Sequence, residues 1–247
     1  MFLSGVTVLS AILPRPWPLI VGAIGFAAGL AWSRRGLHPA AASLFASAAV
    51  AVAMSVPGGA VWPIPPAVAL AVYVGVTWRH PTLGYRAWFR VGDQDRTALV
   101  VAIGSIPLTT LALVAFIVSG RTDLHEATNG LHGLPVALVV LAGIGFALVN
   151  PTVEELLFRG LLQPALVSVG LGATAAVALQ ALAFGALHLH GVPGGPLGMA
   201  MAALWGAMLG FVRHRTDGLR LVWWVHVAAN ATIYSTVVLT ANIRGVL

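Results

Sequence analysis

Long apolar stretches recur along this chain, and the short segments between them hold most of its charged residues. Hydrophobic residues make up 59% of the sequence and charged residues 8%, whereas soluble domains are about 45–50% apolar and 25% charged. The stretches are continuous rather than alternating, which indicates helices and not a barrel, because a backbone in lipid must satisfy its own hydrogen bonds. The sequence therefore predicts an all-α fold, a polytopic transmembrane helical bundle.

Several segments come close to the roughly 20 residues that a helix needs to cross the hydrocarbon core. The eight predicted spans are residues 17–33, 39–56, 63–78, 98–119, 134–150, 173–188, 197–212 and 219–240. Eight spans place ten of the thirteen Arg on one face, which the positive-inside rule makes cytoplasmic. That face includes Arg159, which this prediction puts in a loop at 159–171.

A ninth span at residues 151–170 is the alternative. This stretch is helical in pattern but polar at its start, and we prefer that it does not cross on its own. The turn-like residues 170–172 favour the ninth helix, because Glu154 and His188 lie equally far from them and an antiparallel hairpin would bring the two together.

Several classes of protein are excluded by composition. The chain has no Cys, so it forms no disulfide, thiolate zinc site or cysteine nucleophile. Its net charge of +6 comes from Arg scattered in predicted loops, with no Lys. This pattern is expected from membrane insertion rather than from nucleic-acid binding.

Two carboxylates and a guanidinium interrupt an apolar segment, at Glu154, Glu155 and Arg159. An ionised side chain inside a membrane costs about 2.5–3.5 kcal/mol on insertion scales, so such groups usually mark function. We read Asn150-Pro151 as a helix start or kink, whose positive end would favour the ionised carboxylates. Glu155 and Arg159 are four positions apart and are expected to pair, while Glu154 points about 100° away.

Two further pairs place polar side chains one helical turn apart, Phe184 with His188 and His226 with Asn230. A buried polar group without a partner costs about 1–3 kcal/mol, so Glu154, His188, His226 and Asn230 are expected to converge in the bundle. Each residue alone could equally have a structural role, with its side chain forming a hydrogen bond between two helices. A hydrolase requires Glu154 within one bridging water of His188 or His226.

Together these residues form three ordered motifs: Glu154-Glu155-x-x-x-Arg159, Phe184-x-x-x-His188 and His226-x-x-x-Asn230. The motifs resemble those of the CAAX protease and bacteriocin-processing family, also called CPBP or Abi intramembrane proteases. The resemblance covers about residues 134–240. It implies a catalytic helical core at 134–247, preceded by transmembrane helices of unassigned role at 1–133.

The resemblance also implies roles in peptide hydrolysis. Glu154 would be the base that activates water and later the acid that protonates the leaving amine, with His188 helping to hold the water. His226 and Asn230 would donate hydrogen bonds to the oxyanion.

For the remaining motif residues the resemblance implies structural roles in the site. Glu155 with Arg159 would fix the helix that presents Glu154, and Phe184 would shape the pocket wall. We expect no cofactor. The alternative is a zinc site of one Glu and two His with an open water position, but the sequence lacks His-Glu-x-x-His.

The sequence thus predicts an intramembrane endopeptidase of the glutamic or metallo type. Its expected partners are membrane lipid and a membrane-associated or lipidated peptide, with no nucleic acid. Its expected location is a prokaryotic inner membrane, with the site open to the cytoplasm. The rival functions are a transporter or proton pathway, and a non-catalytic scaffold of the bacteriocin-immunity kind.

Overall fold

The structure is a computed structural model that describes residues 17–34, 36, 38–54, 64–78, 88 and 90–247. Within these ranges the regular elements are all helices, and no strand occurs. The all-α prediction is confirmed.

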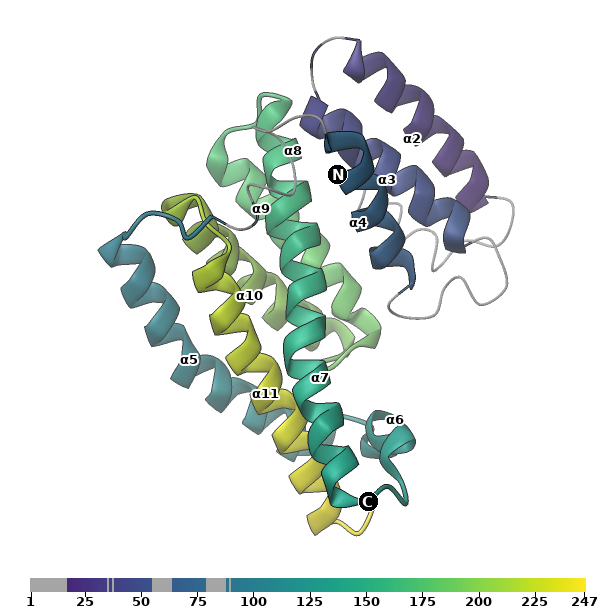
Figure 1. The fold of residues 1–247 in the computed structure, drawn as a ribbon. Helices are drawn as coiled ribbons and strands as arrows, with labels where there is room; N and C mark the ends of the chain where they lie inside the picture. The colour runs from purple at the N-terminus through teal and green to yellow at the C-terminus, as the bar shows by residue number, and fades with distance from the viewer. Residues whose placement is uncertain (1–16, 35, 37, 55–63, 79–87, 89) are drawn as a thin grey trace.

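The centre of the fold is one long helix. It begins as α7 (Val136–Glu155), continues through a π-helical segment (Leu156–Leu162) and ends as α8 (Gln163–Ser168) (Figure 1). Residues 151–170 are therefore the second half of the helix that begins at Val136, and not a ninth span.

The prediction of a helix start at Asn150-Pro151 was wrong, because Pro151 lies inside α7 and is buried. Proline removes one backbone donor, and membrane helices tolerate it when nearby Ser or Thr side chains satisfy the freed groups. Pro151 leaves the Ala147 carbonyl without its intrahelical donor, and the Thr152 hydroxyl donates to the next carbonyl, that of Leu148, at 2.6 Å. The positive end of the helix dipole is at Val136, five turns away, so it does not act on Glu154.

A tight turn reverses the chain after α8. Gly170 has φ +90°, a left-handed conformation that glycine adopts without steric cost, and its N–H donates to the Val167 carbonyl at 3.0 Å. Helix α9 (Ala173–Leu187) then runs back along the long helix and ends in a short 3₁₀ turn, His188–His190. The hairpin suggested by residues 170–172 is present.

Three more long helices complete the C-terminal bundle: α5 (Arg96–Phe116), α10 (Gly195–Thr216) and α11 (Arg220–Ile243). Helix α10 packs on α9, and α11 packs between α7 and α5. The short elements that link α5 to α7 are a π-helical segment (Ile117–Arg121), α6 (Leu124–Thr128) and a 3₁₀ turn (Asn129–Leu131).

The N-terminal helices form a separate layer. Helices α2 (Trp17–Ser33), α3 (His38–Met54) and α4 (Ile64–Thr77) lie beside the second half of the long helix (Figure 1). Two of these helices contact the long helix: α3 contacts α8, and α4 contacts the π-helical segment that precedes α8.

Four described helical stretches are long and apolar enough to cross a membrane: Arg96–Arg121, Val136–Ser168, Gly195–Thr216 and Arg220–Ile243. The other predicted spans form apolar helices of 17, 17, 14 and 15 residues. Helix is thus found at every predicted position, but the count of eight spans is not confirmed.

Candidate active site

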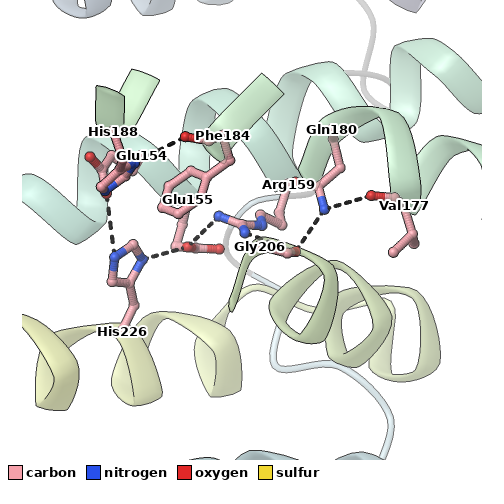
Figure 2. A network of polar contacts seen from close by, with 9 residues as sticks. All are labelled: Glu154, Glu155, Arg159, Val177, Gln180, Phe184, His188, Gly206 and His226. Carbon is pink, nitrogen blue, oxygen red and sulfur yellow. Dashed lines mark hydrogen bonds and ion pairs between the residues drawn. The ribbon is translucent and has the colours of Figure 1, made fainter. Parts of the chain in front are cut away.

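His226 of α11 lies between two adjacent carboxylates of α7. Its Nε2 atom is 3.3 Å from Glu154 Oε2, and its Nδ1 atom is 2.6 Å from Glu155 Oε1 (Figure 2). Only 3% of the His226 side chain is exposed, against 14% for Glu154 and 1% for Glu155. The Glu154–His226 distance meets the requirement for a hydrolase, since a general base must lie within hydrogen-bond reach or one bridging water of its partners.

Glu155 is also the partner of a buried guanidinium. Arg159 Nη1 donates to Glu155 Oε1 at 2.8 Å, so the predicted pairing is confirmed. Arg159 Nη2 donates to the Gly206 carbonyl at 3.1 Å, and the guanidinium carbon lies 4.7 Å from the centre of the Phe184 ring. These contacts compensate a charge that would be costly to bury alone.

The position predicted for Arg159 was wrong. The residue belongs to the long helix, and its side chain is 0% exposed, whereas the sequence placed it in a cytoplasmic loop at 159–171. Because it is neutralised by Glu155 inside the bundle, it does not report on membrane orientation.

The π-helical segment Leu156–Leu162 lies directly after the acid pair. Its Gly160 carbonyl accepts a hydrogen bond from the indole N–H of Trp88 at 3.0 Å. A Cβ atom at Gly160 would come within 2.6 Å of that indole nitrogen, so a larger residue would displace the ring. Trp88 in turn stacks on Tyr73 of α4, with ring centres 5.4 Å apart. The N-terminal layer therefore contacts the helix that carries Glu154 and Glu155. π-Helical segments such as Leu156–Leu162 occur often at functional sites.

A row of buried amides extends the polar network from Arg159 along α10. Gln180 Nε2 donates to the Gly206 carbonyl at 2.8 Å, and Gln163 Nε2 donates to the Gly210 carbonyl at 3.0 Å (Figure 2 shows Gln180 and Gly206). Glycine lets neighbouring helices approach closely in membranes and leaves its carbonyl accessible. Sequence reasoning missed both glutamines. Their signal was an uncharged polar residue within an apolar helix.

His188 ends α9 and turns toward the same region. Its Nδ1 atom lies 3.0 Å from the Phe184 carbonyl, which can only accept, so Nδ1–H is the donor and Nε2 is left with a lone pair in the neutral ring. The His188 ring centre is 4.7 Å from that of Phe184, and the His226 ring centre is 5.9 Å from it. Phe184 thus contacts both imidazoles. In the described part of the chain no hydrogen bond or ion pair joins His188 to Glu154.

A cavity of about 340 Å³ lies beside these residues. His188, His226, Asn230 and Asn150 contribute polar groups to its wall, and the apolar part of the wall includes Leu108. Apolar pockets with a few convergent polar groups are the usual form of a ligand site. Of the predicted site residues, His188, His226, Asn230 and Phe184 line the cavity. Glu154 and Glu155 do not line it and lie against His226.

The described residues contain no group of three or more His, Asp or Glu arranged to hold a metal ion. Both ring nitrogens of His226 lie within ion-pair distance of a carboxylate oxygen, and Nδ1 is hydrogen-bonded to Glu155. The expectation that no cofactor takes part stays a prediction.

Residues 136–232 match the family model described as Type II CAAX prenyl endopeptidase Rce1-like. Over these residues the chain is similar to the CAAX protease and bacteriocin-processing family, as its three motifs suggested. The match includes all three motifs, and the helices before α7 lie outside it. The similarity to a protease family and the long apolar helices together support an integral membrane protein of a protease kind. Searches of the curated proteins and of the solved structures each found no match.

Proposed function

We propose that the chain is an intramembrane endopeptidase that hydrolyses a peptide bond of a membrane-associated substrate with water activated by Glu154. The observation that carries the proposal is the row of contacts Glu154–His226–Glu155–Arg159 within the helical bundle. Four ionisable groups in one buried row are costly, and such arrangements in membranes usually serve chemistry.

The hydrogen-bond partners define where protons lie. Glu155 accepts from Arg159 and from His226 Nδ1, so Nδ1 carries a hydrogen. Glu154 Oε2 lies 3.3 Å from His226 Nε2 and makes no hydrogen bond within the described residues. In the proposal these two groups share one proton, which is on His226 Nε2 when Glu154 is ionised.

This shared proton supports a balanced reaction. Ionised Glu154 takes a proton from water as the water oxygen attacks the substrate carbonyl. His226 Nε2–H, released from Glu154, then donates to the oxyanion. When the oxyanion collapses, the carbon–nitrogen bond breaks and Glu154 returns its proton to the leaving amine. His188, whose Nε2 carries a lone pair, would help to hold the attacking water.

Asn230 supplies the second oxyanion donor in this proposal. It lies one turn beyond His226, is 3% exposed and lines the cavity. Its Nδ2 atom has no hydrogen-bond partner among the described residues. A preorganised donor of this kind is worth about 10²–10³-fold in kcat where it has been removed from other enzymes.

The cytoplasmic opening and the inner-membrane location are part of the proposal. Arg90 pairs with Asp217 at 2.7 Å, and Asp95 pairs with Arg215 at 2.6 Å, so two predicted Arg-rich loops lie at one end of the bundle. The positive-inside rule makes that end cytoplasmic. The substrate class is a membrane-associated or lipidated peptide, and the reaction is proposed to need no metal.

Glu154→Gln tests the proposal, because it keeps the size and hydrogen bonding of the side chain and removes the base. The full chain in proteoliposomes is incubated with hydrophobic quenched-fluorescent decapeptides, and cleavage is followed by fluorescence and mass spectrometry. We expect roughly a 10²–10⁴-fold loss of cleavage with an unchanged thermal unfolding midpoint. The matched control is Glu126→Gln, at an exposed acid of α6. Equal cleavage by wild type and Glu154→Gln would overturn the proposal, and a transporter would show altered ion flux without proteolysis.

A further inference from the structure

Asn150 faces the cavity from α7, one helical turn before Glu154. The sequence suggested that its side chain caps a helix. Because α7 continues through this position, the carboxamide has no cap to form and is available for other contacts. In the described part of the chain the Asn150 side chain makes no hydrogen bond, although it is only partly exposed.

The pairing of α7 with α11 sets Asn150 opposite a known part of the site. The two helices run antiparallel (Figure 1), and Glu154 lies beside His226. Asn150, one turn before Glu154, therefore lies level with Asn230, one turn after His226. The next turn confirms this register, because Phe146 and Tyr234 are in ring contact with centres 6.1 Å apart. Both carboxamides line the same cavity.

A pair of carboxamides matches the chemistry of a peptide backbone. Each Asn offers a carbonyl acceptor and an NH₂ group with two donors, and the Nδ2 atom of Asn230 is buried without a partner among the described residues. An extended peptide entering an apolar cavity leaves backbone N–H and C=O groups that cost free energy unless they are paired. The surrounding wall of Leu108, Met201 and Ile233 suits apolar side chains on that peptide.

We propose that Asn150 binds a backbone amide of the substrate next to the scissile bond, and so selects an extended peptide with apolar side chains. The inference rests on the proposed function, since Asn230 and Glu154 define where the scissile bond lies. Asn150 holds the substrate, and Glu154 performs the chemistry one turn away.

A backbone-ester exchange tests this contact. The probes are a decapeptide cleaved in the proteoliposome assay and a set of analogues in which single backbone N–H groups near the cleaved bond are replaced by ester oxygen. Asn150→Leu is nearly isosteric and apolar. We expect it to lower kcat/KM on the amide peptide by roughly 3- to 10-fold, mainly through KM. With the wild-type protein, one ester analogue should have a kcat/KM lower than that of the amide peptide by the same factor. With Asn150→Leu, that analogue and the amide peptide should have equal kcat/KM. A purely structural role would lower activity on every probe alike.

The control and a second measurement keep this inference separate from the proposed catalysis. Asn242→Leu makes the same substitution at an exposed position of α11 that does not line the cavity, and should leave both kcat/KM and the ester pattern unchanged. Binding of the same peptides to Glu154→Gln protein in nanodiscs, with and without Asn150→Leu, needs no cleavage. If Asn150→Leu binds and cleaves every probe like its parent, the inference is overturned. If binding depends on Asn150 but Glu154→Gln still cleaves, only the catalytic proposal fails.

Discussion

The Nδ1 atom of His226 lies 2.6 Å from Oε1 of Glu155. The same oxygen accepts from Arg159 at 2.8 Å, so a single buried carboxylate oxygen holds both the imidazole and the guanidinium. The sequence assigned Glu155 to helix support alone. The tertiary contact shows that Glu155 also hydrogen-bonds the His226 ring, which faces Glu154.

Glu155→Gln should lower kcat while leaving KM nearly unchanged. The amide oxygen can still accept from Arg159 and His226, but the negative charge that balances them is lost. Where a carboxylate orients a catalytic histidine in other hydrolases, the amide variant loses about 10⁴ in kcat, and we expect roughly 10²–10⁴ here. Michaelis kinetics on the cleaved decapeptide would measure this. An unchanged kcat would contradict a positioning role for Glu155.

Arg159→Met should destabilise the fold strongly, because it leaves the Glu155 charge buried. Removing one partner of a buried ion pair costs about 3–5 kcal/mol. The double variant Glu155→Leu with Arg159→Met removes both charges and should regain most of that stability, since apolar replacement of a buried pair is often neutral. It should nevertheless stay inactive, because His226 loses its Nδ1 partner. Chemical and thermal unfolding in detergent, followed by the cleavage assay, would separate the two effects.

Trp88→Phe should weaken the attachment of the N-terminal layer to the π-helical segment. The ring stays, so the stacking on Tyr73 is kept, but the Gly160 carbonyl loses its donor. Leaving a buried acceptor unpaired costs roughly 1–3 kcal/mol. The matched control is Trp224→Phe, at a residue 58% exposed, where a change within about 0.5 kcal/mol is expected. Equal unfolding midpoints for the two variants would contradict this prediction.

Acid should loosen the contact between the start of α5 and the end of α10. The Arg215 guanidinium, with the Ala98 N–H, holds the pKa of Asp95 below its ordinary value of 3.8. A carboxylate whose pKa is lower in the folded state than in the unfolded state stabilises the fold at any pH above the unfolded-state pKa. This stabilisation is lost as the pH falls through the folded-state pKa. Thermal midpoints measured from about pH 6 to 3 should fall, and Asp95→Asn should flatten that dependence. An unchanged slope in Asp95→Asn would assign the acid sensitivity to other groups.

Local patterns were enough to predict the helices. Each predicted span coincides with a helix, because a run of apolar residues determines its own hydrogen bonding in lipid wherever it packs. The Glu155–Arg159 pair was predictable for the same reason, since a spacing of four positions on one helix determines the contact. The ordered motifs likewise placed Glu154 and His226 on helices that could meet.

The local prediction failed where packing overrides a local signal. Asn150-Pro151 has the composition of a helix start, yet α7 continues through it with Pro151 buried in the bundle. Arg159 follows a charged segment that resembles a loop boundary, yet it is satisfied by Glu155 and by the Gly206 carbonyl inside the bundle.

The sequence by itself determined that this chain is a bundle of apolar helices and which side chains could carry chemistry. The tertiary structure decided how they meet: His226 between two carboxylates, Trp88 on the Gly160 carbonyl, and Asn150 level with Asn230. The physical reason is the range of the interactions. Hydropathy and helical periodicity depend on residues within a few positions of each other, whereas the contact between Glu155 and His226 joins residues 71 positions apart and exists only once α7 and α11 have packed in one register.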